Sequence, residues 1–458
     1  MKRGIVRAST WLFTIVLVTA VGAGGVSAYT LFGGDLDLKG HVRNITSTRT
    51  QNPHPGLGGG QFDEWDIGLM RSFLQLEATV TLSPAFRVYA RGRAEYDASF
   101  DIKGVEDFPD GVVDDQRDDI DIRELFVDLR QGPLFLRIGK QQVVWGESDG
   151  LRLADIINPL DLSWHYLLES WEDIRIGLWM VRGIYSLTPN LDVELVWNPA
   201  KFEPTKWAGA GTYWEVPGLG RGGIPERHYG TELDNGSVGA KIRAILPWGI
   251  EASVYDYYHR NEMPSLTLTP TGLFWTHPYV NSIGATFNTF LEWPKTVFRG
   301  EAVYTMNEPQ LDFTSSNFIS DKDSVAFMFG LDRNTYLPIN PESSLISFQV
   351  FHKKVLDTDE TTVSFGGPGE DFQTVVTGFL SSSYPHLIPN ATLTPQVLVA
   401  YDVEGAGWVQ PQISLRYGDH WGTTLGSNFF WGHDTTRGFF NPVNDRDEIF
   451  LSLKYSFQ

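Results

Sequence analysis

One short motif in the sequence has the spacing of a catalytic nucleophile. Gly146-Glu147-Ser148-Asp149-Gly150 matches the G-x-S-x-G turn on which α/β-type hydrolases present a serine, and Asp161 and His165 follow as further members of a triad. That turn requires a parallel sheet covered by helices, and no alternation of strands and helices surrounds it here. An esterase using Ser148 therefore stays an alternative. The favoured interpretation is a glycine-bounded turn that takes the chain off a strand end, without enzymatic activity.

The segment that carries this motif, 145–172, is acidic and partly apolar. Leu151, Ala154 and Ile157 recur at helical spacing and need cover from water. We therefore expect this segment to fold into the interior of the protein as a plug or constriction loop. Its acidic candidates for a constriction are Glu147, Asp149, Asp155 and Asp161.

The elements that must position this loop are predicted to be β-strands. In residues 70–82 the even positions are mostly apolar and the odd ones mostly polar, and segments of about 10–13 residues repeat this alternation to the end of the chain. Strands of globular proteins average about 5–6 residues, whereas a tilted membrane crossing takes about 9–11. The pattern predicts a transmembrane barrel in which Leu76 faces lipid and Gln75 faces the lumen.

Turns and loops alternate along the chain. Short links such as Ser83-Pro84, Gly132-Pro133 and Gly418-Asp419 alternate with long polar ones such as 145–172 and 200–236. This alternation is typical of outer-membrane barrels, whose periplasmic turns are short and extracellular loops long. The fold predicted is an all-β antiparallel barrel of about 18 strands. A barrel of 16 is the alternative, because the strands near Leu191 and Phe372 are weak.

The same alternation places a set of arginines in the lumen. Acidic loop residues beside these arginines would form either a charged constriction that orients polar or anionic solutes, or ion pairs that only pin the loop. As a specific hypothesis, three of them, Arg91, Arg93 and Arg137, hold the loop through Glu147, Asp149 and Asp155. The full inward set is Arg71, Arg87, Arg91, Arg93, Arg137 and Arg175.

The chain ends and the composition set further expectations. Residues 1–28 have the basic start, short apolar stretch and Val26-Ser27-Ala28 site of a secretory signal peptide, which leaves 29–458 as the mature barrel. Alternating apolar residues up to Phe457 resemble the signal read by the barrel-assembly machinery. The chain has no cysteine, and its formal net charge is −20. Thiolate sites and nucleic-acid partners are thus disfavoured, and no cofactor is expected.

Two other groups of residues have simple interpretations. The acidic run 106–121 is expected to be a solvated extracellular loop, with a divalent cation that bridges lipopolysaccharide phosphates as the alternative. Six aromatic residues near strand ends are expected to form interfacial girdles, with a sugar slide as the alternative: Trp197, Trp248, Trp293, Trp421, Trp431 and Tyr455.

Residues 137–161 resemble a family of bacterial outer-membrane proteins known only as a domain of unknown function. The matching positions are the strand end Arg137-Ile138-Gly139-Lys140-Gln141, then Val143-Val144-Trp145-Gly146-Glu147-Ser148, then Asn158-Pro159-Leu160-Asp161. The resemblance implies a porin-like barrel. Members are often encoded near RND-type exporters, which implies traffic of hydrophobic compounds together with an inner-membrane partner.

The expected protein is an outer-membrane channel or transporter for small solutes or hydrophobic compounds. Lipid, lipopolysaccharide and the assembly machinery are its expected partners, with an inner-membrane exporter as a further one. The alternatives are a structural barrel that sheathes a partner protein, which requires an open lumen, and the esterase that uses Ser148.

Overall fold

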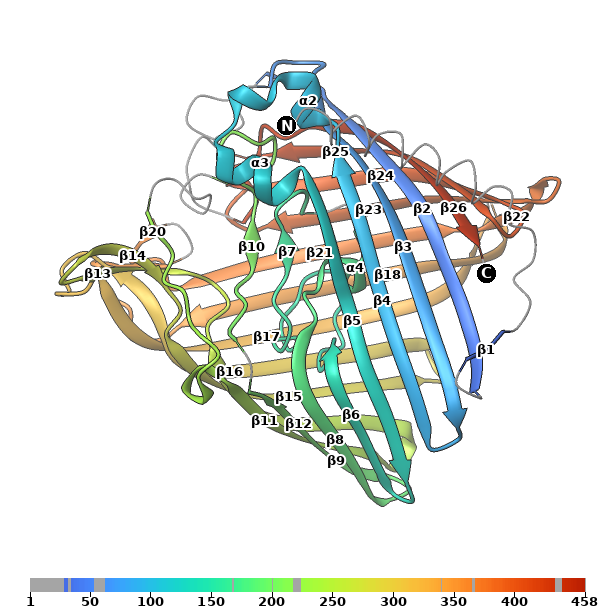
Figure 1. Ribbon diagram of the computed structural model, residues 1–458, viewed down its shortest axis with the longest axis horizontal. Helices are drawn as coiled ribbons and strands as arrows, with labels where there is room; N and C mark the ends of the chain where they lie inside the picture. The colour runs from blue at the N-terminus through green and yellow to red at the C-terminus, as the bar shows by residue number, and fades with distance from the viewer. Residues whose placement is uncertain are drawn as a thin grey trace.

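The computed structural model describes residues 29–31, 34–52, 62–166, 169–199, 201–216, 224–338, 340–364, 367–432 and 439–457. The predicted signal peptide lies outside these residues. A closed antiparallel barrel of 18 strands makes up most of the described chain (Figure 1). Its strands are β2 (Gly34–Arg49), β3 (Ile67–Ser83), β4 (Phe86–Asp97), β5 (Asp118–Gln131), β6 (Leu134–Gln141), β8 (Leu178–Thr188), β9 (Leu191–Asn198), β11 (Ser237–Leu246), β12 (Ile250–Arg260), β15 (Tyr279–Leu291), β16 (Thr296–Asp312), β17 (Ile319–Leu337), β18 (Asn340–Val355), β21 (Phe372–Ser382), β23 (Ala391–Asp402), β24 (Gly407–Tyr417), β25 (Trp421–Trp431) and β26 (Glu448–Phe457).

Each barrel strand pairs with the strand that follows it in this order, and the last pairs with the first. The closing pair joins β2 to β26 from Gly40↔Phe457 to Arg49↔Glu448. The two strands that are weak in sequence, β9 and β21, are both present in the wall. The predicted fold is therefore confirmed, with 18 strands rather than 16.

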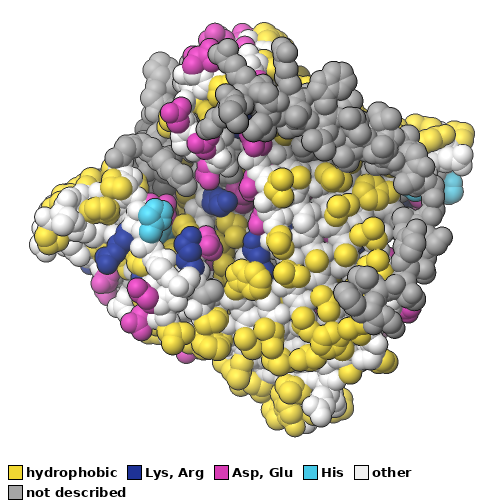
Figure 2. Space-filling model, in the orientation of Figure 1, with side chains coloured by type: hydrophobic (Ala, Val, Ile, Leu, Met, Phe, Trp, Pro, Cys, Tyr) yellow, Lys and Arg dark blue, Asp and Glu magenta, His cyan; other side chains and the backbone are white. Residues whose placement is uncertain are grey.

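The outer face of the wall is apolar, as the alternation predicts. Leu76 is 42% exposed while its neighbour Gln75 is only 3% exposed, because the two side chains point to opposite faces of β3. Figure 2 shows hydrophobic side chains spread over the wall, with basic side chains from the middle to the left of this view and acidic ones there and up to the top. Trp248 and Trp293 project from two turns and are 90% and 88% exposed. Such a surface suits lipid rather than water.

Short turns lie at one end of the barrel and most long connections at the other. The long connections carry the helices α2 (Ser99–Lys103), α3 (Asp110–Gln116) and α4 (Trp171–Ile174) and the 3-10 turns η1 (Val105–Asp107), η2 (Leu233–Asn235) and η4 (Asn441–Val443); η3 (Pro247–Gly249) is a short turn. The remaining strands are short: β1 (Tyr29–Leu31), β7 (Asp161–Leu162), β10 (Lys206–Trp207), β13 (Ser265–Thr269), β14 (Gly272–Thr276), β19 (Thr362–Ser364), β20 (Gly367–Pro368) and β22 (Tyr384–Ile388). No helix among the described residues is long and apolar enough to span a membrane.

The long connections pack on one another to cover their end of the barrel. The acidic run 106–121 is not a plain solvated loop, because α3 buries Val112 and Val113 in a cluster with Phe62, Phe108 and Trp214. The described residues include no group of three His, Asp or Glu that could hold a metal ion. The cover is therefore built on an apolar core.

Candidate functional site: a loop across the barrel lumen

Residues 142–177, between β6 and β8, leave the wall and fold into the lumen. We call them the lumen loop; 167–168 are outside the described residues. Asn158 ties the two ends of the loop together. Its Oδ1 accepts the Val143 N–H at 2.7 Å, and its Nδ2 donates to the carbonyls of Gln141 and Ile176 at 3.2 and 2.8 Å. The side chain is fully buried, so it replaces the hydrogen bonds that the chain loses on leaving the sheet.

The first part of the loop packs on an apolar seat in the lumen wall. Trp145, Ala154 and Ile157 are 1%, 0% and 2% exposed, and they pack with inward residues of the wall that include Tyr255 and Val303. The Trp145 indole N–H also donates to Glu194 on β9 at 3.1 Å. Ala154 and Ile157, which were expected to need cover from water, are buried here. Leu151 instead packs on the cluster under the long connections.

The tip of the loop is held by the wall strands β15 to β18. The Glu301 carboxylate on β16 accepts the backbone N–H groups of Glu147, of Ser148 at 2.8 Å and of Ala154 at 2.8 Å. Arg299, two residues earlier on the same face, binds the Glu147 carbonyl and the Asp149 carboxylate, each at 2.5 Å.

Further contacts fix the same tip. Asn288 on β15 donates to the Glu147 carboxylate at 3.0 Å, and Gln349 on β18 accepts the Gly150 N–H at 3.0 Å. The loop leaves the wall at β6 and its tip reaches β18, with β8, β9, β11, β12, β15, β16 and β17 between them. The loop therefore crosses the lumen.

The second part of the loop contacts the opposite side of the barrel. His165 and Glu448 of β26 are 2.6 Å apart, and the side chains of both are fully buried. Glu169 pairs with Arg43 of β2 at 2.5 Å. Burial raises the pKa of Glu169 to about 6, although Arg43 opposes this shift. The Arg71 guanidinium lies over the Trp164 ring, with its Cζ 4.9 Å from the ring centre.

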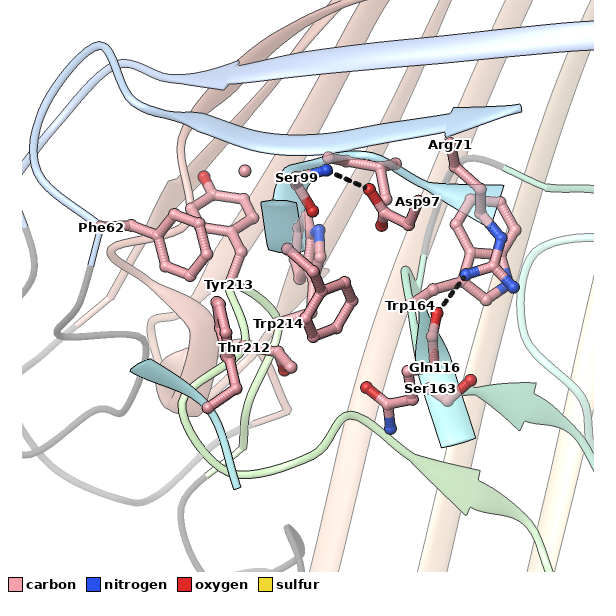
Figure 3. A pocket seen from close by; sticks show the side chains of 14 residues that line it. Phe62, Arg71, Asp97, Ser99, Gln116, Ser163, Trp164, Thr212, Tyr213 and Trp214 are labelled. Carbon is pink, nitrogen blue, oxygen red and sulfur yellow. Dashed lines mark hydrogen bonds between the residues drawn. The ribbon is translucent and has the colours of Figure 1, made fainter. Parts of the chain in front are cut away.

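A small pocket lies where this part of the loop meets the cover. It has about 340 Å³ of empty space, some of it open to solvent. Figure 3 shows Trp164 and Arg71 at one side of it and the aromatic rings of Phe62, Tyr213 and Trp214 at the other. Arg71 is already paired with Glu95, but its Nε is buried without a hydrogen-bond partner.

The returning end of the loop, α4 and the residues after it, is held by arginines of β4 and β5. Arg91 pairs with Glu172 at 2.6 Å, and Arg93 pairs with Asp173 at 2.7 Å. Arg123 donates to the carbonyls of Asp173 and Arg175 at 2.6 and 3.0 Å. Burial tends to raise the pKa of Asp173, but Arg93 and Arg43 hold it below its ordinary value.

Several predicted charge partners differ from those observed. Arg91 and Arg93 do hold the loop, but through α4 rather than through Glu147, Asp149 and Asp155. The hypothesis that Arg137 holds the loop is wrong, because Arg137 binds Asp128 of the neighbouring strand at 2.6 Å.

The other predicted residues bind partners in the wall or within the loop. Arg87 also pairs with Asp128, at 2.5 Å, and so stays on the wall. Arg175 was expected in a wall strand but lies on the loop, where it binds Asp155 at 2.6 Å. The fourth predicted acid, Asp161, accepts the Ser163 hydroxyl at 2.5 Å. Burial tends to raise its pKa, but Lys206 and this hydrogen bond lower it below its ordinary value.

The wall residues that sequence analysis missed include Arg43, Asn288, Arg299, Glu301 and Gln349. Alternation along their strands would have placed them inward, but it does not say which inward residues the loop reaches. That depends on the path of a segment with little regular structure.

The members of the alternative catalytic triad contact different parts of the barrel. The backbone of Ser148 binds Glu301 of β16, whereas His165 binds Glu448 of β26, and six strands of the barrel order lie between these two. Ser148 Oγ is buried without a hydrogen-bond partner. This arrangement lacks the hydrogen bond from nucleophile to base that such chemistry requires.

A closed barrel with an apolar outer face, a polar lumen and an inward loop defines an outer-membrane β-barrel of the porin type. The family model described as "Protein of unknown function (DUF1302)" matches residues 7–457, nearly the whole chain. The chain belongs to this family, as its resemblance in residues 137–161 implied.

Solved structures share the fold at low sequence identity. OccAB4 of Acinetobacter baumannii aligns with a TM-score of 0.53 at 10% identity, over 94% of this chain and 99% of that one. OccAB2 of the same organism gives 0.51 at 11% identity, over 92% and 98%. The outer-membrane protein opdK of Pseudomonas aeruginosa gives 0.50 at 10% identity, over 92% and 99%. No curated protein matches the chain.

Proposed function

We propose that the protein is an outer-membrane channel for small polar solutes, in which the lumen loop sets the width of the path. The observation that carries this proposal is the anchoring of one loop to both sides of the lumen, through Glu301 and Arg299 on one side and Arg43 and Glu448 on the other. A loop fixed in this way narrows a pore without needing to move.

Two sets of observations support a polar cargo. The inward side chains of the wall include many charged and amide groups, which favour water-soluble solutes. The chain also shares its fold with outer-membrane proteins of the Occ type. We further propose that lipid covers the apolar outer face and that β26 presents the assembly signal.

The structural alternative has less support. A barrel that sheathes a partner protein needs an open lumen, and the lumen loop crosses it. Transport of hydrophobic compounds with an inner-membrane exporter would need an apolar path. The apolar seat under Trp145 is instead filled by the loop itself.

Planar-bilayer recording on the purified protein tests the proposal. We expect small, discrete conductance steps in KCl, and swelling of proteoliposomes in small polar solutes. Protein that is folded, as judged by heat-modifiable migration on a gel, but neither conducts nor admits any solute would refute the channel. Purified protein that hydrolyses lipid esters, with activity lost in Ser148→Ala, would instead support the esterase.

A further inference from the structure

The lumen wall has two chemically different parts. From β2 through β16 the inward side chains include many charged groups, whereas the middle of β21, β23, β24 and β25 presents amide, hydroxyl and apolar groups. We call the second part the neutral wall and define it by Thr377, Gln396, Gln412, Ser414 and Thr424. In Figure 1 its strands lie on the far side of the barrel, in orange to red.

Inward orientation of the neutral wall follows from the exposure of its neighbours. Val399, Ile413 and Leu425 are 37%, 50% and 54% exposed on the outer face, so the adjoining residues of each strand point into the lumen. Gln396 and Gln412 are opposite each other in register, and so are Ser414 and Thr424.

The side chains of the neutral wall bond mainly to one another. Gln412 Nε2 donates to Gln396 Oε1 at 2.8 Å, and the hydroxyls of Ser414 and Thr424 are 2.9 Å apart. All four side chains are half-buried and keep contact with the lumen. Each pair therefore retains donors and acceptors for a passing solute.

On the charged part of the wall, exposed basic side chains form ion pairs with carboxylates of the wall. Lys39 and Arg87, 50% and 44% exposed, pair with Glu77 and Asp128 of the wall. Two further pairs join wall arginines to exposed acids of the lumen loop. Asp149 is 73% exposed beside Arg299, and Glu172 is 63% exposed beside Arg91. A charged solute would have to displace these partners before it could pair with the same side chains.

The tip of the loop meets the neutral wall at Gly150. A Cβ atom on Gly150 would lie 2.9 Å from Thr377 Oγ1 and 3.1 Å from Gln349 Oε1, so the backbone approaches this wall closely. Gln349 is 1% exposed, and its Nε2 is buried without a hydrogen-bond partner. Asp149, the preceding residue, carries an exposed carboxylate that binds Arg299 of β16. The loop tip thus brings an exposed carboxylate, one residue from Gly150, to the edge of the neutral wall.

We infer that the solute path follows the neutral wall and admits uncharged, hydroxyl-rich solutes in preference to anions or cations. This inference rests on the proposed channel and specifies its substrate class. A solute hydroxyl can replace its hydrogen bonds to water by hydrogen bonds to an amide, a hydroxyl or a paired carboxylate of the protein. The net free-energy cost of this exchange is small. An ion in the same place loses hydration without gaining a free counter-ion.

Three six-carbon solutes of similar size separate the possibilities in proteoliposome swelling. We expect glucose to enter faster than gluconate, which is anionic, and faster than glucosamine, which is cationic. Gluconate or glucosamine entering several-fold faster than glucose would overturn the inference and leave the channel intact. If none of the three enters and no KCl conductance is seen, the channel proposal itself fails.

Two variants locate the path. Gln396→Leu with Gln412→Leu should reduce glucose entry about fivefold, as the loss of one or two ordinary hydrogen bonds predicts. Thr424→Leu should act in the same direction. Thr423→Leu is the matched control, because Thr423 is on the outer face in register with Leu415 and Leu453. Glucose entry that is unchanged in the Gln and Thr424 variants, all folded by gel, would place the path elsewhere and refute the inference.

Discussion

Glu301 of β16 accepts the backbone N–H of Ala154 at 2.8 Å, so a wall carboxylate binds the main chain of the lumen loop. The same carboxylate also accepts N–H groups of Glu147 and Ser148. Glu301 is 4% exposed and Ala154 fully buried. One wall residue therefore fixes both the outgoing and the returning chain at the tip of the loop.

Removing this carboxylate should free the loop tip. Hydrogen bonds to a charged group are worth about 1.5–3 kcal/mol each, and Glu301→Ala loses up to three of them. We expect a folded barrel with larger and noisier single-channel conductance. Glu301→Gln, which keeps one acceptor oxygen, should be intermediate. Glu292→Ala, in an exposed turn of the same hairpin, serves as control. Conductance equal to wild type in Glu301→Ala would mean that apolar packing alone holds the tip.

Reversing the charge of Arg93 should release α4. Arg93 is 5% exposed and pairs with Asp173, so Arg93→Glu sets two carboxylates against each other, at a cost of about 3–5 kcal/mol where burial is deep. Adding Asp173→Arg in the same chain should restore part of the wild-type conductance. Arg87→Glu disturbs only a pair within the wall and should leave α4 in place. Failure of the double variant to recover any of the effect would argue against this pair.

Salt gives an independent check on the same contacts. The Debye length falls to about 3 Å at 1 M ionic strength, so exposed pairs such as Arg299 with Asp149 should weaken. We expect the conductance noise of the wild type, relative to its mean conductance, to rise with KCl concentration. The Glu301→Ala variant should depend less on salt, because its loop tip is already free.

Arginine substitutions on adjacent residues of β25 test the orientation of the wall. Leu425 is 54% exposed on the outer face, and arginine near the bilayer midplane costs about 2–4 kcal/mol there. Leu425→Arg should reduce the folded fraction on a heat-modifiability gel, and Thr424→Arg should not. Equal loss in both would contradict the assigned faces. Gln75→Arg, which alternation alone suggests is harmless, is a poor control, because Gln75 already accepts two hydrogen bonds from Arg93.

The contribution of Glu262 to stability should rise as the medium is acidified. Burial raises the pKa of Glu262 from 4.5 to about 7, against the attraction of Arg152. A raised acid pKa means that the folded state binds the proton more tightly. The contribution of this carboxyl to stability is thus full below about pH 4.5 and is lost as the pH rises to about 7, by at most about 3 kcal/mol. Glu262→Gln should raise the unfolding temperature at pH 7.5 and not at pH 4.5. An equal shift at both pH values would show that the carboxyl does not titrate in this range.

The wall could be predicted from sequence because alternation reports directly on burial. Leu76 is apolar and Gln75 is polar. Because the wall separates membrane from lumen, Leu76 is expected to face lipid and Gln75 the lumen. The inward arginines of β3, β4 and β6 were placed correctly for the same reason. Alternation with a period of two residues tells only which face of its strand each side chain is on. For a barrel wall, that information is enough to predict the environment of the side chain.

The partners of those arginines were not predictable in the same way. Arg137 finds Asp128 one strand away, a pairing that requires the register of β5 and β6. Glu301 binds backbone N–H groups, which no side-chain pattern reports. Asn158 joins the two ends of the loop through main-chain atoms, and the sequence marks it only as part of an Asn-Pro turn.

The contacts of His165 and Glu169 have a consequence for assembly. Glu448 and Arg43, which they bind, lie on β26 and β2, the two strands whose pairing closes the cylinder at the two ends of the chain. The lumen loop therefore binds both strands of the closing pair, β2 and β26, from the lumen side. Its second half can dock fully only once the last strand has met the first, so loop docking and seam closure should be coupled as a late, cooperative step of folding.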